Sequence, residues 1–244
     1  MRSIRIHVAT ALQVGAETTL PVQAAAHVLR VLRLRAGDTL TLFNGDGHDY
    51  PARLTAADGR DAAVRIESRQ AVENESPLRI TLAQALARGE KMDWIVQKAT
   101  ELGVAEIVPL LTERSEVKLD DKRASKRLEH WHAVVIGACE QSGRAVVPAL
   151  HAAQPLAAWL ATLDADARST RWVLHPGEAG APRVQQATPH TVIAVGPEGG
   201  FGDSDLAALH AAGFSNLLLG PRILRTETAG LAALAALQAR FGDF

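Results

Sequence analysis

The chain has 244 residues, 26 Lys and Arg against 27 Asp and Glu, one cysteine and a formal net charge of -1. This length predicts one large domain or two small ones, and 47% apolar residues suffice for a hydrophobic core. One cysteine excludes a disulfide framework, no Cys/His cluster has zinc spacing, and no apolar run reaches the roughly 18–20 residues of a membrane span. The N-terminal segment lacks the apolar core of a signal peptide, so we expect a cytoplasmic protein with no metal and no membrane partner.

Residues 1–72 are predicted to form a small β-barrel interrupted by one helix. Short apolar runs flanked by turn residues predict strands at residues 4–8, 38–43, 50–54 and 63–67. Asn44–Gly47 is a clear turn signal. A helix is predicted from Val22 to Leu34, because Pro21 suits its first turn and Gly37 follows its end.

The polar segment Glu73–Pro77 is predicted to link this part to a second domain, giving domains at residues 1–72 and 76–244. Strand-like runs then alternate with helical ones, which predicts a mostly parallel sheet covered by helices, an α/β fold. The expected strands are residues 78–83, 105–111, 171–175, 191–195 and 216–219, and the expected helices are residues 90–102, 122–142, 155–163, 203–212 and 226–241.

Two strand-loop-helix segments are the candidate functional site. In the first, an apolar strand ends at Val195 and runs into the glycine-rich loop Gly196–Gly202, with Asp203 or Ser204 as helix cap. Glycines there let a ligand approach the backbone, although a tight turn is an equal alternative. The pattern matches neither a phosphate-binding P-loop nor the dinucleotide fingerprint.

The second segment, Leu217–Ala229, places Arg222 and Arg225 beside a helix start that Thr226 or Thr228 can cap. Two arginines at the positive end of a helix do not add stability, which favours an anion site such as RNA phosphate over ordinary surface arginines.

These segments resemble the RsmE family, 16S ribosomal RNA uridine-N3 methyltransferases of the SPOUT class. The matching motifs are Gly196-Pro-Glu-Gly-Gly-Phe201, Leu219-Gly-Pro-Arg-Ile-Leu-Arg-Thr-Glu-Thr-Ala229, Arg88–Met92, Gln97–Gly103, Cys139–Arg144 and His27–Arg33. They occur in order along the whole chain. The resemblance implies an N-terminal PUA-like β-barrel and a C-terminal SPOUT α/β domain with a deep trefoil knot. It also implies a homodimer acting on 16S rRNA within the small ribosomal subunit.

The resemblance further implies that S-adenosyl-L-methionine binds in three loops, Leu174–Gly177, Gly196–Gly200 and Leu219–Leu224. The cofactor-binding residues expected from it are Leu174, His175, Val195, Gly196, Pro197, Glu198, Gly199, Gly200, Leu219, Gly220, Ile223, Leu224 and Thr228. A purely structural role is the alternative for His175 at its strand end, and helix capping is the alternative for Thr228.

The expected reaction moves a methyl group from the sulfonium of the cofactor to uracil N3. Because N3 is a weak acid, a base or a positive charge near the developing anion would help. Arg225 is the candidate for the positive charge, and Glu198 for the base or for orienting its loop through backbone amides. N3 lies on the pairing edge of the base, so the target must be unpaired or flipped out.

RNA contacts are expected from His27, Arg30 and Arg33, whose three-residue spacing places them on one face of the predicted helix. An ordinary solvated face is the alternative. The full expected RNA-binding set is Arg2, Arg5, His27, Arg30, Arg33, Arg144, Arg222 and Arg225. Arg144 has the alternative role of neutralising a helix end. The bases between Lys91 and Arg127 alternate with acids and are interpreted as ordinary surface pairs.

Three competing functions stay open at the level of sequence. One is another SPOUT chemistry, such as ribose 2′-O methylation, and the second is a non-catalytic RNA-binding or ribosome assembly factor. The third, nucleotide hydrolysis, is disfavoured because the chain lacks a phosphate-binding loop and a set of magnesium carboxylates.

Overall fold

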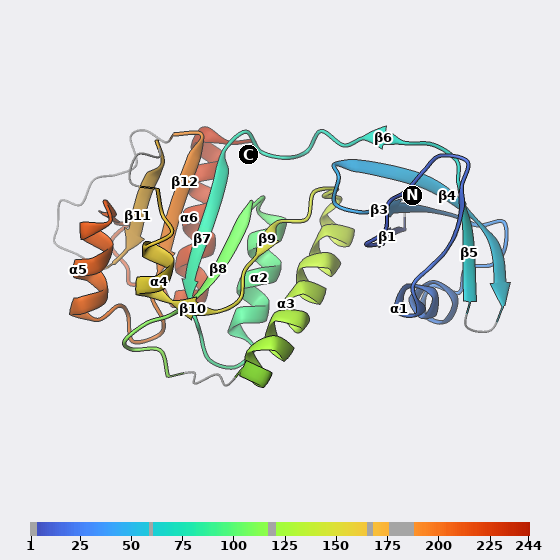
Figure 1. Cartoon of the computed structure of the whole chain (residues 1–244). Coiled ribbons are helices and arrows are strands. Elements are labelled where there is room, and N and C mark those ends of the chain that lie inside the picture. Colours follow the sequence, from blue (N-terminus) through green and yellow to red (C-terminus); the bar gives the residue numbers. More distant parts are fainter. Residues whose placement is uncertain (1–3, 59–60, 117–120, 165–167, 176–187) are drawn as a thin grey trace. The chain divides into compact units, whose positions relative to one another are not determined.

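The computed structural model describes residues 4–58, 61–116, 121–164, 168–175 and 188–244, and the chain divides into two compact units (Figure 1). The first unit contains residues 1–75 and 136–147, and the second contains residues 76–135 and 148–244. The first unit therefore includes residues 136–147 from the middle of the chain. The predicted division into two continuous domains did not include this segment in the first one.

The first unit is built on a six-stranded sheet. Its strands are β1 (Arg5–His7), β2 (Glu17–Thr19), β3 (Thr39–Phe43), β4 (His48–Asp58), β5 (Asp61–Ile66) and β6 (Gln70–Ala71). They pair in the order β1-β3-β4-β5-β2, with β6 on β4, and only β1 and β3 run parallel. The four predicted strands are confirmed, and so is the turn before β4, where Gly45 and Gly47 have φ of 90° and 84°. In the described residues the two end strands, β1 and β2, do not pair with each other.

The predicted helix over residues 22–34 is wrong beyond Ala26. The α-helix α1 (Val22–Ala26) passes into a π-helical turn, η1 (His27–Val31), in which the amide of Leu32 donates to the carbonyl of His27. Arg33, with φ of 57°, ends the helical segment. The neighbouring leucines pack partly buried against the core, so tertiary packing overrides the local helix preference.

This π-helical turn removes the basis for a shared face of His27, Arg30 and Arg33. Hydrogen bonds from residue i to i+5 widen the turn, so a three-residue spacing no longer returns to one side. All three side chains are nevertheless exposed. Val31, an apolar residue of the same turn, is 67% exposed.

Ion pairs join the two parts of the chain that make up the first unit. Arg144, only 4% exposed, donates from Nε and Nη2 to the two carboxylate oxygens of Glu75 at 2.9 and 2.5 Å. Arg5 pairs with Asp49 and also donates to the backbone carbonyl of Arg144 at 3.0 Å. Burial, opposed by the Arg5 charge, raises the pKa of Asp49. These contacts explain why residues 136–147 belong to this unit.

The second unit contains a parallel sheet, as predicted. Its strands are β7 (Arg79–Ala85), β8 (Glu106–Leu111), β9 (Ala149–Leu150), β10 (Gln154–Pro155), β11 (Thr170–Leu174), β12 (His190–Val195) and β13 (Ser215–Leu217). The order is β10-β8-β7-β12-β11-β13, with β9 on β8, and every pairing is parallel. The sequence order reverses between β7 and β12, so the carboxyl edge there is a topological switch point, where ligands of such sheets bind.

The helices of the second unit are α2 (Lys91–Glu101), α3 (Asp121–Ser142, of which residues 136–142 belong to the first unit), α4 (Leu156–Leu160), α5 (Asp203–Ala211) and α6 (Thr226–Phe241). α6 packs on β7, β12 and α2, whereas α4 packs on β8, β10 and α5 (Figure 1). The five predicted helices are therefore confirmed, with α4 shorter than expected. Among the described residues, no helix is both long and apolar enough to span a membrane.

The predicted helix caps are wrong by one to three residues. α5 is capped at Gly202, whose amide donates to the carboxylate of Asp205 at 3.1 Å, rather than by Asp203 or Ser204. The cap residue of α6 is Arg225. Thr226 is the first helical residue and is buried. Its hydroxyl donates to the carbonyl of Gly196 in the neighbouring loop, so it does not cap its own helix.

Candidate active site

A cavity of about 570 Å³ opens at the carboxyl edge of the parallel sheet in the second unit. Three segments form most of its wall: Leu174 and His175 at the end of β11, Val195–Phe201 after β12, and Ile223–Glu227 with Ala229 at the start of α6. Lys91 and Arg114 complete it. A smaller cavity of about 70 Å³ adjoins it and adds Leu217, Leu218, Leu219 and Arg222. The larger volume lies within the roughly 300–1,000 Å³ of small-molecule sites.

Most of the residues expected to hold a cofactor lie in these two cavities. Leu174, His175, Val195, Gly196, Pro197, Glu198, Gly199, Gly200, Ile223 and Leu224 line the larger one, and Leu219 lines the smaller one. Gly220 and Thr228 line neither, and Thr228 is exposed. Pro176 and Gly177, the remainder of the first expected loop, lie outside the described residues.

The glycine-rich loop is a tightly closed turn at the cavity wall. A Cβ placed on Gly196 would lie 2.9 Å from the backbone nitrogen of Phe201 and 3.0 Å from the carbonyl carbon of Gly200. Gly200 itself has φ of 70°, which favours glycine. The two interpretations of the glycine pattern, a tight turn and a ligand-binding loop, are thus compatible. The segment is a tight turn, and it lines a cavity.

A buried hydrogen-bond relay fixes this loop to the start of α6. The hydroxyl of Thr226 donates to the carbonyl of Gly196 at 2.6 Å and accepts from Nε2 of Gln84 at 2.9 Å. Gln84 is fully buried on β7, and its Nε2 also donates to the carbonyl of Ala85 at 3.0 Å. Three segments far apart in the sequence are held together at one wall of the cavity. Sequence reasoning missed Gln84, although a polar residue inside an apolar strand was the available signal.

Glu198 connects the loop to the segment that follows β7. Its carboxylate accepts from the backbone amide of Arg88 at 3.0 Å and from Nζ of Lys91 at 2.9 Å. Burial pushes the pKa of Glu198 upward, but these hydrogen bonds outweigh it and lower the pKa below its ordinary value. A carboxylate of lowered pKa is a weak proton acceptor, so the geometry favours the loop-orienting role over that of a base.

Lys91 lies between two carboxylates at the cavity mouth. Besides Glu198, its Nζ is 3.6 Å from a carboxylate oxygen of Glu227 in the first turn of α6. The hydrogen bond to Glu198 is the main reason that the pKa of Lys91 is raised. Pairing with acids agrees with the surface interpretation of the sequence, yet these particular pairs lie at the site.

Arg114 is a second cavity residue that the sequence analysis did not single out. Its Nη1 donates to the carbonyl of Gly199 at 3.1 Å. Arg114 follows β8 closely, and the carboxyl ends of parallel strands meet at one edge of the sheet. Its position just after a predicted strand is the feature of the sequence from which Arg114 could have been predicted at the site.

Cationic and apolar side chains stand exposed at the mouth. Arg225 lines the larger cavity and Arg222 the smaller one, and both are exposed. Ile223 between them is 85% exposed although it borders both cavities. Contact with a partly apolar ligand would remove this apolar side chain from water, which is favourable in free energy.

The remaining predicted RNA contacts lie in the first unit. Arg5 and Arg144 form the internal ion pairs described above, so their guanidinium groups are engaged inside the fold, and we leave both out of the proposed RNA contacts. Arg2 lies outside the described residues. Cys139 is buried, and burial raises the pKa of its thiol to about 11.

Comparison with known proteins places this geometry in a class. The chain matches the family described as RNA methyltransferase domain over residues 74–238, and the family described as RNA methyltransferase PUA domain over residues 20–67. The chain is therefore an RNA methyltransferase with an N-terminal PUA-like domain.

Individual relatives narrow the class further. Ribosomal RNA small subunit methyltransferase E of Bacillus subtilis is 33% identical over 86% of this chain and 85% of its own length, and that of Buchnera aphidicola from Schizaphis graminum is 31% identical over 98% and 97%. The Neisseria gonorrhoeae enzyme of that name, solved with S-adenosylmethionine, is 39% identical with a TM-score of 0.91 over 100% of both chains. A putative methyltransferase of Legionella pneumophila, solved with the same cofactor, is 41% identical with a TM-score of 0.93 over 100% of both chains. The chain belongs to the ribosomal RNA small subunit methyltransferase E family.

Proposed function

We propose that the chain transfers a methyl group from S-adenosyl-L-methionine to N3 of a uridine in 16S rRNA of the small ribosomal subunit. The observation that carries the proposal is the cavity itself, since ten of the thirteen expected cofactor residues line it and an eleventh lines its neighbour. Relatives that cover 98–100% of the chain are named ribosomal RNA small subunit methyltransferase E, and one of them was solved with this cofactor. A putative methyltransferase that covers 100% of the chain was solved with the same cofactor.

The residues of the cavity fit the cofactor by their chemistry. Leu174, Ile223 and Leu224 offer an apolar surface for an adenine ring, and the close turn at Gly196 presents backbone groups without a side chain in the way. The carboxylate of Glu227 is a suitable neighbour for a cationic sulfonium. When bound, the cofactor supplies an electrophilic methyl group.

The chain's own residues must position a uracil and stabilise its deprotonated form. Uracil N3 is neutral at pH 7, and negative charge develops on the ring as its proton leaves. The exposed guanidinium of Arg225 at the cavity mouth is placed to stabilise that charge. Glu198 is held by Arg88 and Lys91 and acts on the loop.

The architecture implied by the family completes the proposal. The first domain, residues 1–72, is a PUA-like β-barrel that contributes RNA contacts from His27, Arg30 and Arg33. The second domain lies within residues 76–244, of which residues 136–147 pack with the first. In the second, α6 returns to the sheet centre at β12 and β7 after β13 at the edge, a path that a C-terminal trefoil knot requires. The enzyme acts as a cytoplasmic homodimer, with the 54%-exposed Trp94 on α2 available for subunit contact.

The test is methylation of small ribosomal subunits isolated from a strain that lacks the enzyme. With isotopically labelled cofactor, nuclease digestion and mass spectrometry should identify a single labelled nucleoside, N3-methyluridine. A label on a ribose oxygen would instead favour the 2′-O chemistry, and a label on a carbon would contradict the N3 proposal. Binding of RNA without any transfer would favour a non-catalytic assembly factor.

A further inference from the structure

We propose that the first two turns of α3 form a second contact for rRNA, a site for backbone phosphates within the catalytic unit; this inference rests on the proposed function. Four of the six residues from 122 to 127 are basic: Lys122, Arg123, Lys126 and Arg127. The first three are exposed and Arg127 is partly exposed. We call these four residues the α3 basic cluster.

The fold gains little from these charges. Positive side chains at the start of a helix face the positive end of its dipole, which is unfavourable. Within the described part of the chain, neither Lys122 nor Lys126 has an ion pair with a carboxylate, whereas Lys98 binds Glu101 at 2.8 Å. Residues 121–129 contain four basic and two acidic side chains, a net charge of +2. Lys122 and Lys126 thus depart from the surface pairing expected from the sequence, and within the described residues these two side chains are available to an external anion.

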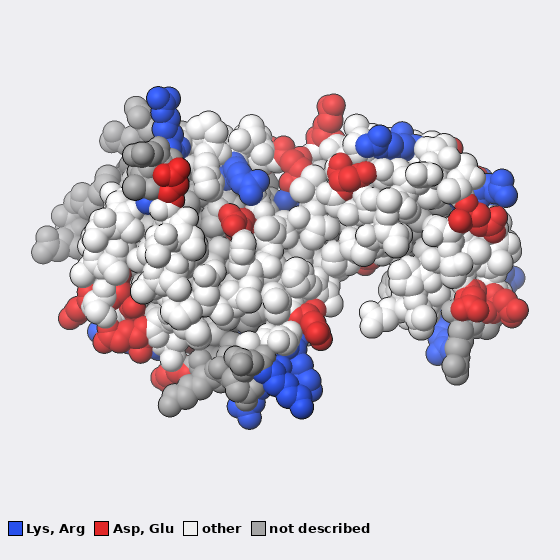
Figure 2. All heavy atoms as spheres, viewed as in Figure 1, with Lys and Arg blue, Asp and Glu red and all other residues white. Residues whose placement is uncertain are grey.

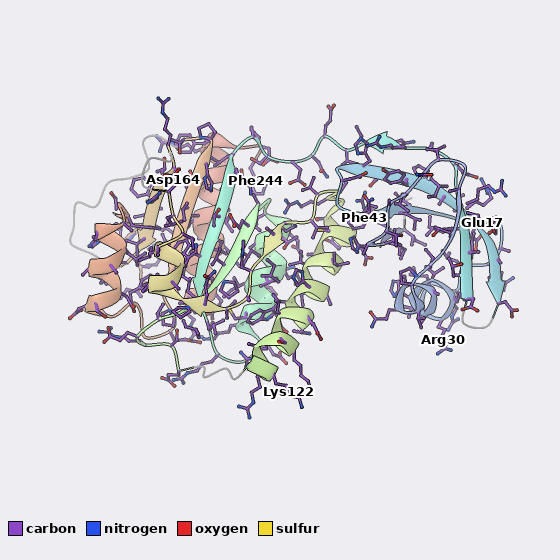
Figure 3. All side chains as sticks on the ribbon, in the orientation of Figure 1. Glu17, Arg30, Phe43, Lys122, Asp164 and Phe244 are labelled. Atoms are coloured by element: carbon purple, nitrogen blue, oxygen red, sulfur yellow. The ribbon has the colours of Figure 1, made fainter. Side chains whose placement is uncertain are left out.

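The surface views agree with this reading. Figure 2 shows blue side chains gathered at the lower end of the second unit, where α3 begins. Figure 3 shows the side chain of Lys122 extending away from the helix into solvent. No side chain of residues 122–127 is a large apolar group, so the surface lacks the apolar centre that protein interfaces contain. Its chemistry suits the phosphate oxygens of RNA, which lysine and arginine contact without reading the base.

The cluster lies on the same edge of the sheet as the cavity. The segment after β8 contains Arg114, which bonds to the cofactor loop, and Glu116, which pairs with Arg88. α3 begins five residues after Glu116, and a fully extended chain of that length spans at most about 18 Å. RNA that enters the cavity mouth therefore passes within reach of these side chains.

The middle of α3 is hydrogen-bonded to α2, the helix that begins at the cavity residue Lys91. The carboxylate of Asp93 on α2 bonds to Nε2 of His130 at 2.7 Å and to the indole nitrogen of Trp131 at 3.0 Å. Asp93 lies two residues after Lys91, a cavity residue. A phosphate held by the cluster is thus held at a set distance from the methyl transfer site.

The test compares two double variants that remove the same charge. Lys122→Gln/Lys126→Gln removes two charges from the cluster, and Arg79→Gln/Arg168→Gln removes two from exposed positions at or near the opposite, amino ends of β7 and β11. Affinity for small ribosomal subunits lacking the modification is measured by filter binding across a salt series. Calorimetry with S-adenosylmethionine and size-exclusion chromatography check cofactor binding and oligomeric state.

Loss of two phosphate contacts lowers the slope of log affinity against log salt by about 1.4–1.8, which corresponds to about 15- to 30-fold weaker binding at 0.15 M salt. We expect this change for the cluster variant alone, with cofactor binding unchanged. Equal weakening by both variants, no weakening by either, or an altered oligomeric state in the cluster variant would overturn the inference. If the wild-type chain binds subunits but transfers no methyl group, the proposed function fails while the cluster is still tested by the binding data.

Discussion

The hydroxyl of Thr226 offers the sharpest single-atom test of how the cofactor loop is held. Thr226→Val keeps the shape of the side chain but removes the donor to the carbonyl of Gly196 and the acceptor for Gln84. Gln84 keeps its bond to Ala85, so the substitution leaves one buried carbonyl without a donor and one buried N–H of Gln84 without an acceptor. Such a group costs about 1–3 kcal/mol. The loop can avoid that cost only by moving, which disturbs the cavity wall.

We therefore expect Thr226→Val to unfold at lower temperature and to bind S-adenosylmethionine about 5- to 100-fold more weakly, since about 1.4 kcal/mol corresponds to a factor of ten. Thr226→Ser is the matched control, because it keeps both hydrogen bonds and loses only a methyl group. Thermal unfolding and titration calorimetry measure the two effects. If the valine and serine variants bind the cofactor equally well, the relay does not position the loop and the reasoning is refuted.

Four further predictions concern single groups. Arg225→Ala should lower the rate of methyl transfer about 100-fold with unchanged cofactor affinity, and a normal rate would remove Arg225 from the mechanism. Because the folded-state pKa of Glu198 is depressed, its stabilisation is present above the ordinary glutamate pKa and is lost as the pH falls through the lowered value. As the pH falls from 7 to well below the ordinary glutamate pKa, the wild-type melting temperature should thus fall further than that of Glu198→Gln, and parallel curves would contradict the anchoring role. Arg144→Ala should destabilise the protein by about 2–3 kcal/mol in denaturant titration, below the roughly 3–5 kcal/mol of a fully buried pair because Glu75 is partly exposed; a change under about 0.5 kcal/mol would show that the pair is dispensable. With its pKa raised by burial to about 11, the Cys139 thiol should resist alkylation at pH 8 until denaturant is added, and labelling of the native protein at the rate of a free thiol would show that it is accessible.

The parallel sheet and its site could be predicted from the sequence because local signals and tertiary structure agree there. The buried strand β12 is apolar from Val192 to Val195 and ends at the glycine-rich loop. The carboxyl edge of a parallel sheet then gathers loops whose strands are far apart in sequence. Residues such as Gly196 and Ile223 were accessible to this reasoning.

The features that the sequence could not predict depend on tertiary contacts. The π-helical turn at His27–Val31 has the same apolar and basic residue types as an α-helix, and packing of the leucines decides between them. Arg144 resembles a free surface arginine in sequence until Glu75, 69 residues away, is brought against it. The caps of α5 and α6 were missed because Thr226 and Asp205 bond to loops that only the folded chain brings close.

Titration of S-adenosylmethionine into the wild-type chain and into Gly196→Ala tests most directly whether the cavity at the sheet edge is the cofactor site. An alanine methyl group at Gly196 would lie 2.9 Å from the backbone nitrogen of Phe201, so the loop must move. Gly137→Ala is the control, because a Cβ there meets nothing within 4 Å. We expect one cofactor per chain for the wild type and the control, and at least tenfold weaker binding for Gly196→Ala. Absence of binding to the wild type, or equal affinity in all three, would contradict the account.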